Sequence, residues 1–472
     1  MKTSRTNSPD WSGMIPLLQR EGSRASALYA ALRDLVESGQ LKPGAKLPPS
    51  RQLASQLAIS RGAVVAAFDQ LAADGFVEAT VGSGTFVAQA VPRPRQLALK
   101  PTFEPSVLPF RPGRMGSAMM DEATFATLRR LITKDLRQPA LRGLHYSDPR
   151  GSDELREEIA NYLRTARGVR LDADQVMITS GSQQALDLVL RALLSPGDQV
   201  WMEDPGYPAA VALLRGNGLK IAAVPVDAEG LTVSVGRSLA PRAKAVYVTP
   251  SHQYPLGVTM TMTRRLALLD WARSSSAWII EDDYDSEFRY AGPPLTSLQG
   301  MDGVDRVIYL GTFSKALFPG LRIGYVVLPS VIMERVITLR ERTDHYPQTL
   351  AEGALAAFLR EGHFASHLRR ARKRARNSRD ALIAGLSEGP IKAVSPAQGL
   401  HLVAQAPRHL SEGRAVQLAH EAGLGVRPLS SMYLATKPLP GLLIGFSGFS
   451  PDDFYRASRA FSHLATREQA QR

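Results

Sequence analysis

Apolar residues near the start of the chain follow the period of a helix. In residues 25–38 they recur at intervals of three and four: Leu28, Leu32, Leu35 and Val36. Gly39 predicts the end of this helix. Two shorter helical patterns follow, SRQLASQLA and SRGAVVAAFDQLAADG, and each opens with a serine suited to cap it. The run FVEATVGSGTFVAQA then predicts two brief strands joined by Gly82-Ser83-Gly84. Helices followed by a hairpin predict a winged helix-turn-helix over residues 1–89.

The pattern changes twice after the hairpin. Residues 90–114 carry many prolines and no clear period, which predicts an extended linker. Beyond it, short β-rich runs alternate with helical segments: QVMIT, QVWME, LKIAAVPV, AKAVYVTP, AWIIEDD, RVIYLGT and RIGYVVLP. This alternation predicts an α/β domain over residues 115–472, with a mostly parallel central sheet covered by helices.

Composition narrows the class of protein. The chain has 472 residues, of which 44% are hydrophobic and 21% charged, as expected of a globular protein with more than one domain. It contains no cysteine, which excludes disulfides and thiolate metal sites, and we predict no metal site. No secretory signal or apolar run of roughly 20 residues is evident, so we expect a cytoplasmic protein without a membrane span.

The formal net charge of +13 favours a polyanionic partner. The densest basic run is HLRRARKRARNSRD, residues 367–380. For this run we favour a solvated helix face over a phosphate-binding surface.

The predicted helix-turn-helix indicates where DNA would bind. In such motifs the second helix enters the major groove with its first residues nearest the bases, and Ser60 and Arg61 occupy that position. Arg51 and the wing residues Gly82 and Ser83 are placed to contact phosphates. We therefore expect operator DNA as a partner.

The run from Leu47 to Val87, LPPSRQLASQLAISRGAVVAAFDQLAADGFVEATVGSGTFV, closely resembles the GntR-type winged helix. It departs from that family's usual hydroxyl residues after the arginine, where it has Gly62 and Ala63.

A single lysine stands where an apolar run ends in IYLGTFSKALFPGLRIGY. Lys315 is well placed to form a Schiff base with pyridoxal phosphate (PLP), because desolvation lowers the pKa of a lysine amine. PLP chemistry also needs a carboxylate beside the ring nitrogen, and EDDYDSEF offers Asp282 or Asp283. ITSGSQQALDLVL supplies a helix N-terminus for the phosphate at Ser182 and Gln183.

Further side chains complete the predicted PLP site. Tyr207, in EDPGYP, follows a strand and can cover the ring. Arg322 adds charge at the phosphate, and Thr312 adds a hydroxyl.

Residues from about 115 to 465 resemble a fold-type I aminotransferase, and the joined pair of domains resembles the MocR/GabR family of transcriptional regulators. The resemblance implies that Lys315 holds PLP, that Asp282 pairs with the pyridine nitrogen and that Tyr284 approaches the 3′-oxygen. It also implies stacking by Tyr207 and a phosphate site made of Ser182, Gln183, Thr312 and Arg322. Tyr146, in HYSDPRG, resembles a tyrosine that reaches the phosphate of the neighbouring subunit, which implies a head-to-tail homodimer.

Departures from the aminotransferase pattern bear on function. Tyr254 stands where many aminotransferases have an asparagine for the 3′-oxygen, and His252 or Gln253 could substitute for it. Two arginines that usually bind substrate carboxylates are absent: Ala209 occupies one position, and the stretch LIGF from Leu443 replaces the other.

Arg427 could take over that role, although a loop arginine is commonly solvated. The absent cations favour a regulator over an enzyme. We expect a PLP-dependent transcriptional regulator that senses an amine, an amino-acid derivative or a B6 vitamer. An active aminotransferase with an accessory DNA-binding module is the alternative.

Overall fold

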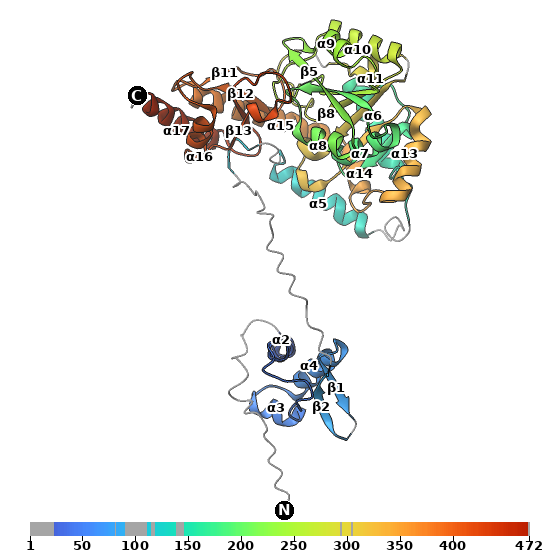
Figure 1. Cartoon of the computed structure of the whole chain (residues 1–472), viewed down its shortest axis with the longest axis vertical. Coiled ribbons are helices and arrows are strands. Elements are labelled where there is room, and N and C mark those ends of the chain that lie inside the picture. The colour runs from blue at the N-terminus through green and yellow to red at the C-terminus, as the bar shows by residue number, and fades with distance from the viewer. Residues whose placement is uncertain are drawn as a thin grey trace, which may run out of the picture. The chain divides into compact units, whose positions relative to one another are not determined.

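The chain divides into two compact units, Met1–Val107 and Leu108–Arg472 (Figure 1). The structure is a computed structural model that describes residues 23–80, 82–89, 111–114, 119–137, 146–292, 295–303 and 305–470. Most of the predicted linker, residues 90–110, therefore lies outside the described residues, as do residues 1–22. The described end of that segment belongs to the second unit, because the carbonyls of Pro112 and Gly113 accept hydrogen bonds from the amides of Gly425 and Gly445.

The first unit is the predicted winged helix-turn-helix. Its elements are α2 (Arg24–Glu37), α3 (Ser50–Gln56), α4 (Arg61–Ala73), β1 (Val77–Thr80) and β2 (Gly84–Val87), and the two strands pair antiparallel. Its core consists of the periodic apolar residues of the helices, among them Leu28, Leu32, Val64 and Leu71. The helical period thus placed the buried face correctly.

The two serine caps that the sequence predicted have different outcomes. Ser60 caps α4, because its Oγ accepts a hydrogen bond of 3.2 Å from the amide of Ala63. The prediction is wrong for Ser50, which is already the first residue of α3, after Pro49. Proline fixes its own φ and lacks an amide proton, so the chain enters α3 without a side-chain cap.

The second unit contains an eight-stranded sheet in the order β3-β10-β9-β8-β7-β4-β5-β6. Its strands are β3 (Val176–Thr179), β4 (Gln199–Asp204), β5 (Lys220–Asp227), β6 (Gly230–Leu231), β7 (Ala245–Val248), β8 (Trp278–Asp283), β9 (Val307–Thr312) and β10 (Gly324–Val327). All seven predicted strands are present, and the short β6 was missed. The sheet is mostly parallel, as predicted; β10 runs antiparallel to both its neighbours and β6 to β5.

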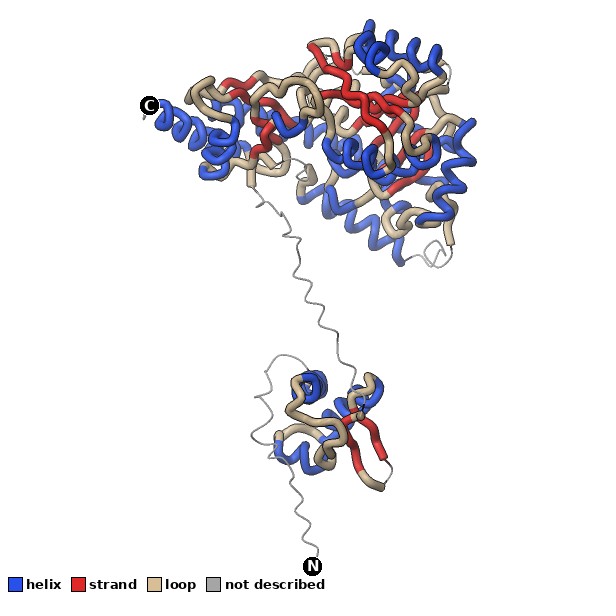
Figure 2. Tube along the Cα trace, viewed as in Figure 1, coloured by secondary structure: helices blue, strands red, loops and turns tan. Residues whose placement is uncertain are grey.

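Helices cover both faces of this sheet (Figure 2). They are α5 (Glu122–Arg137), α6 (Asp153–Arg167), α7 (Ser182–Leu193), α8 (Pro208–Gly216), α9 (Val233–Leu239), α10 (Met262–Ser275), α11 (Leu298–Met301), α12 (Phe313–Ala316), α13 (Ser330–Thr343) and α14 (Glu352–Arg360). Side chains of β3 alternate between two cores: Val176 and Ile178 pack into one, and Met177 packs into the other. Burial on both faces explains why these strands are continuously apolar.

A smaller layer is built from the C-terminal part of the chain. A four-stranded antiparallel sheet has the order β11 (Lys392–Ala393), β12 (His401–Gln405), β14 (Leu442–Gly445), β13 (Val426–Pro428). Three helices accompany it: α15 (His363–Leu386), α16 (Glu412–Glu421) and α17 (Pro451–Ala470). Its core includes Phe454 and Phe461 of α17 and Leu382 of α15.

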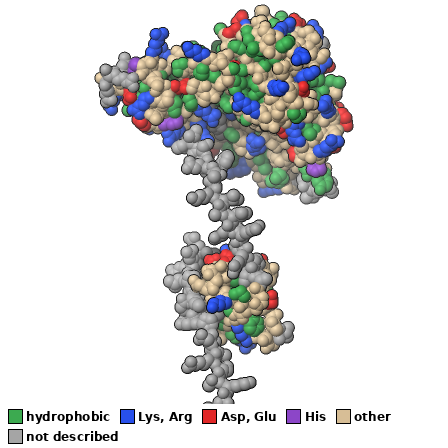
Figure 3. Space-filling model, viewed as in Figure 1, with side chains coloured by type: hydrophobic (Ala, Val, Ile, Leu, Met, Phe, Trp, Pro, Cys, Tyr) green, Lys and Arg blue, Asp and Glu red, His purple; other side chains and the backbone are tan. Residues whose placement is uncertain are grey.

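The basic run at residues 367–380 lies on α15, and Arg369, Arg370, Lys373 and Arg376 are exposed, in line with its interpretation as a solvated face. Most of its arginines also bond to neighbouring loops. Arg370 and Arg374 both form ion pairs with Asp121. Three further arginines donate to backbone carbonyls: Arg372 to Glu287, Arg376 to Tyr290 and Arg379 to Pro396. Loops of the second unit pack against this helix and place acceptors within reach of the long side chains. On the face shown in Figure 3, lysine and arginine side chains are scattered over the second unit instead of forming one patch. Among the described helices, none combines the length and the apolar character that a membrane span requires.

Candidate functional site

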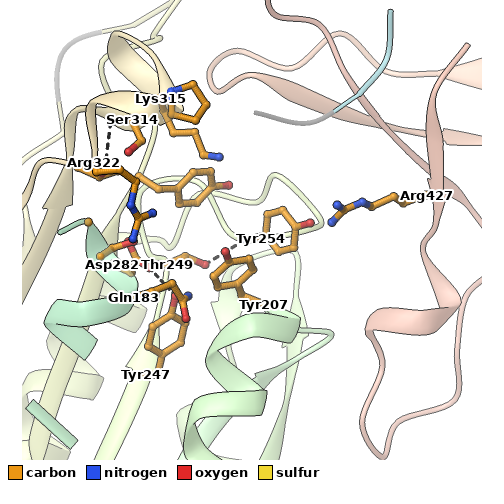
Figure 4. Close-up of a pocket in the computed structure, with 15 residues that line it drawn as sticks. Gln183, Tyr207, Tyr247, Thr249, Tyr254, Asp282, Ser314, Lys315, Arg322 and Arg427 are labelled. Carbon is orange, nitrogen blue, oxygen red and sulfur yellow. Dashed lines mark hydrogen bonds between the residues drawn. The ribbon is translucent and has the colours of Figure 1, made fainter. Parts of the chain in front are cut away.

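Five strands of the large sheet end at one cavity. β4, β7, β8 and β9 are mutually parallel, and β3 has the same direction because β10 is antiparallel to both β3 and β9. The carboxyl ends of such strands meet at one edge of the sheet, which is where α/β folds place ligand sites. A cavity of about 280 Å³ lies there. Its lining comprises Gly181, Ser182, Gln183, Tyr207, Tyr247, Thr249, Tyr254, Asp282, Tyr284, Thr312, Ser314, Lys315, Pro319, Arg322 and Arg427 (Figure 4).

Asp282 lies on the wall of this cavity, at the end of β8. Its Oδ2 accepts a hydrogen bond of 2.6 Å from the hydroxyl of Tyr247. Its Oδ1 is buried and has no partner among the described residues. Burial raises the pKa of this carboxyl to about 6, while the bond from Tyr247 acts in the opposite direction. The carboxylate is therefore costly to ionise unless a proton donor occupies the cavity.

The neighbouring Asp283 has a separate role. It forms an ion pair of 2.7 Å with Arg167 and accepts a short hydrogen bond from the hydroxyl of Tyr309. It does not line the cavity. The structure thus separates the two carboxylates that the sequence left as alternatives for the ring nitrogen.

Lys315 follows β9 on the short helix α12 and lines the cavity. Burial lowers the pKa of its ammonium, against the charges of Asp285 and Asp282, which raise it. The charge of Arg427 lowers this pKa further. A partly desolvated amine of this kind is a better nucleophile at neutral pH than an exposed lysine.

The N-terminus of α7 forms one end of the cavity. Gly181 caps the helix with a φ of +99°, and Ser182 and Gln183 begin it. The guanidinium of Arg322 lies beside this turn, where a Cβ on Gly181 would be 3.7 Å from Nη1. Free amides at a helix start and an arginine together favour an anion such as a phosphate. Thr312 lies at the same cavity, and its Oγ1 accepts a hydrogen bond of 3.1 Å from the amide of Ser314.

Close backbone approach shapes this anion-binding end. A Cβ on Gly324 would lie 2.7 Å from the Cα of Gly181. Any larger residue at position 324 would therefore displace the turn before α7, beside which Arg322 lies.

Four tyrosines line the cavity, and besides Tyr247 they are Tyr207, Tyr254 and Tyr284, whose rings lie close together. The rings of Tyr207 and Tyr254 meet edge to face at 5.2 Å, and those of Tyr254 and Tyr284 at 6.1 Å. Burial raises the pKa of all three hydroxyls. They stay neutral at physiological pH and can pack on or hydrogen-bond to an aromatic ligand.

Neither residue that the sequence offered as a substitute for the missing asparagine lines the cavity; Tyr254 itself does. The Nε2 of Gln253 donates to the carbonyls of Pro205 and Tyr254. His252 is buried, and its Nδ1 lies 3.1 Å from both carboxylate oxygens of Asp285. The role of His252 is indirect, because the hydroxyl of Tyr284 donates to its carbonyl at 3.0 Å.

His252, Asp285 and His401 form a buried cluster in which one candidate ligand atom from each residue lies within 4.8 Å of the others. Burial lowers the pKa of His401 to about 3, so its ring is neutral. The cluster joins the loop after β7 to β12 of the smaller sheet, since the amide of Leu400 also bonds to Asp285.

The two positions that lack an arginine are filled differently. Leu443 is fully buried against Tyr254 and Leu429. Ala209 is a half-buried residue of α8. Arg427, which the sequence left open, lies on β13 and lines the cavity.

Tyr146 does not line this cavity. Its side chain is 90% exposed and contacts the ring of Tyr346 edge to face at 5.9 Å. Its predicted contact with a second subunit stays a prediction.

The predicted DNA-binding residues are all exposed on the winged helix. Arg51 lies on α3, Ser60 and Arg61 lie at the start of α4, and Gly82 and Ser83 lie at the tip of the hairpin. The Nε of Arg61 lies 3.5 Å from the Oγ of Ser50, which joins the starts of the two helices.

Sequence reasoning missed several residues that the structure brings to these sites, among them Lys46 and Tyr247. Lys46 pairs with Phe86 of the wing through an isolated β-bridge, and its side chain lies close to Gly84. Tyr247 supplies the hydrogen bond to Asp282. The signal for Tyr247 was a single hydroxyl in the otherwise apolar strand AVYV.

Both parts of the chain match known protein families. Residues 24–87 match the model of bacterial regulatory proteins of the gntR family, and residues 120–448 match aminotransferase class I and II. The chain is 36% identical to the probable rhizopine catabolism regulatory protein MocR of Rhizobium meliloti, over 90% of each chain. It is 35% identical to the HTH-type pyridoxine biosynthesis transcriptional regulator PdxR of Corynebacterium glutamicum, over 90% of this chain and 92% of that one. The crystal structure of kynurenine aminotransferase from Pyrococcus horikoshii superposes with a TM-score of 0.68 at 29% identity, over 75% of this chain and 90% of that one.

Proposed function

Because this chain belongs to the MocR family of transcriptional regulators, in which a GntR-type winged helix is fused to an aminotransferase-like domain, we propose that it binds operator DNA and senses an effector through PLP. The effector would be an amine, an amino-acid derivative or a B6 vitamer. The observation that carries the proposal is the unpartnered Oδ1 of Asp282 in the cavity that Lys315 also lines.

The residues of the cavity fit PLP. A protonated ring nitrogen would satisfy Oδ1 of Asp282, and the turn before α7 with Arg322 would hold the phosphate. Lys315 would hold the aldehyde carbon. The remaining roles are stacking by Tyr207, an approach of Tyr284 to the 3′-oxygen, and phosphate contacts from Ser182, Gln183 and Thr312.

Bound PLP supplies an aldehyde that condenses with amines and a ring that withdraws electrons. The chain's own residues prepare that chemistry. Burial lowers the pKa of the Lys315 ammonium, and Tyr247 orients Asp282 by its hydrogen bond.

We propose that the domain works as a homodimer, with a head-to-tail arrangement in which Tyr146 reaches the phosphate of the other subunit. The ring of Tyr146 is 90% exposed and is therefore accessible to a second subunit. An effector could change DNA binding only if it has different affinities for two conformations of the protein.

An active aminotransferase with an accessory DNA-binding module is the second candidate. The buried Lys315 favours it, because the same amine could serve catalysis. Leu443 argues against it, because it fills one of the two arginine positions with a fully buried apolar side chain. We therefore propose the regulator, with any transamination as a side reaction.

Replacing Lys315 with alanine tests the proposal. We expect the purified wild type to show the absorbance of lysine-bound PLP, and Lys315→Ala to lose both this absorbance and any effector-dependent change in operator affinity. Basal operator affinity in the variant serves as the control for folding of the winged helix. An unchanged effector response in Lys315→Ala would refute the sensor mechanism, and steady turnover of amino donor and keto acid would favour the enzyme.

A further inference from the structure

The charged residues of the cavity fall into two groups. Among the described residues that line it, the cations are Lys315, Arg322 and Arg427, and the only acid is Asp282. Arg322 lies at the anion-binding turn before α7. Arg427 comes from β13 of the smaller sheet and lies across the cavity from Arg322, with its guanidinium directed toward Tyr254 (Figure 4).

The charge of Arg427 has no counter-charge. Arg427 is exposed, and the structure gives it no ion pair with any described residue, whereas Arg414 of the same layer is paired with Glu421 and Glu468. Its influence on the cavity is visible in the neighbouring groups: its charge opposes the rise in pKa of Tyr254 and Tyr207. A guanidinium stays protonated at any physiological pH, so this side of the cavity is permanently positive.

Asp282 cannot neutralise this charge. Its Oδ2 is bonded to Tyr247, and its Oδ1 is the acceptor that the proposed cofactor would use. The described lining of the cavity therefore offers Arg427 no anion, and a ligand that enters the cavity can supply one.

We propose that Arg427 is the anion-binding group for the effector, which is an amine that also carries a carboxylate. This inference rests on the proposed function, because it assigns the amine end of the effector to the cofactor held by Lys315. The carboxylate then pairs with the guanidinium, which presents two parallel N–H donors to such a group.

The placement of Arg427 links effector binding to the smaller sheet. Lys315 follows β9 of the large sheet, and Arg427 belongs to β13 of the smaller one. An effector held at both ends contacts both sheets at once, so its affinity depends on their relative position. That dependence is the differential affinity that a regulator needs.

Binding of three ligand series to full-length, PLP-loaded protein tests the inference. The series are ω-amino acids of increasing length from glycine upward, alkylamines of matched length, and matched diamines, each titrated against cofactor absorbance. We expect the wild type to bind the best amino acid about 10- to 100-fold more tightly than its matched alkylamine, the range of a charged hydrogen-bonded pair.

Variants of Arg427 make the test specific. Arg427→Ala should abolish the preference for the amino acid over its matched alkylamine. Arg427→Lys should keep part of the preference, and Arg427→Glu should reverse it in favour of the diamine. Arg408→Ala is the matched control, since Arg408 is exposed on the same layer but does not line the cavity.

The outcomes separate this inference from the proposed function. Normal cofactor absorbance with an undiminished preference in Arg427→Ala overturns the inference alone, as does a wild type with no preference or no binding in any series. A wild type without cofactor absorbance overturns the proposed function and this inference with it. The reversal in Arg427→Glu cannot result from misfolding, because it is a gain of affinity.

Discussion

The hydroxyl of Tyr247 donates a hydrogen bond of 2.6 Å to one oxygen of Asp282, and the other oxygen of that buried carboxylate has no partner among the described residues. One carboxylate oxygen thus accepts a hydrogen bond from a donor on β7, and the other is left for a donor on a ligand. The charge state of Asp282 therefore depends on whether a hydrogen-bond donor occupies the cavity.

The stability of cofactor-free protein should depend on pH through Asp282. Burial raises its pKa to about 6, above the value of about 3.9 for an exposed aspartate. The folded state therefore holds the proton more tightly, and the stabilisation is complete below about pH 4 and is lost as pH rises through about 6. The difference corresponds to on the order of 3 kcal/mol.

Urea unfolding of cofactor-free wild type and Asp282→Asn measures this effect. Asparagine does not titrate, so Asp282→Asn should not lose this stability as the pH rises through about 6. The variant should therefore gain stability relative to wild type between pH 4 and 7. Other buried acids such as Glu287 remain in both proteins and cancel in the comparison. The same variant should bind PLP about 10- to 100-fold more weakly, because it loses the charge beside the ring nitrogen. Parallel pH profiles of the two proteins would contradict the assignment.

Gly324→Ala should damage the phosphate end of the cavity. The new Cβ would lie 2.7 Å from the Cα of Gly181, so the turn before α7 must shift, at about 1–3 kcal/mol. We expect weaker binding of both PLP and free phosphate, measured by absorbance and calorimetry. Gly216→Ala is the matched control, because a Cβ there meets nothing within 4 Å. Equal phosphate affinity in both variants would show that the turn does not bind the anion.

Arg61 and Arg51 should differ in their effects on DNA binding. Arg61 begins α4, the helix expected in the major groove. Arg51 lies on α3, where we expect it to contact the phosphates of the DNA backbone. Arg61→Ala should weaken operator binding by about 1–3 kcal/mol and random duplex less, whereas Arg51→Ala should weaken both alike and reduce the salt slope by about 1. Titrations at several salt concentrations distinguish the two. Identical losses of specificity would refute base reading by Arg61.

Ser60→Ala should loosen the start of α4. The Oγ of Ser60 accepts the amide of Ala63, and removal of such a cap costs about 1 kcal/mol. Hydrogen exchange at the amides of Ala63 and Val64 should accelerate. Ser50→Ala should leave the start of α3 unchanged, since Ser50 makes no cap bond there. Equal exchange in wild type and Ser60→Ala would contradict the capping role.

Local features of both units could be predicted from sequence. The helical period of Leu28, Leu32 and Leu35 placed the buried face of α2, and seven apolar runs located seven strands of the large sheet. These patterns are local, since side-chain periodicity depends only on the secondary structure of the segment that carries it. The family motifs likewise identified Lys315 and Asp282 as candidates.

Which side chains share the cavity depended on tertiary structure. Successive residues of a strand point to opposite faces, so EDD alone could not decide between Asp282 and Asp283; the packing of Arg167 and Tyr309 against Asp283 did. Arg370 and Arg374 likewise form ion pairs with Asp121, which lies far away in the sequence. Arg427 of β13 lines the cavity together with Tyr254 and Lys315, which lie far from it in the sequence. Sequence by itself determined the elements and their chemistry, and long-range packing decided their partners, because burial and charge pairing depend on residues that only the fold brings together.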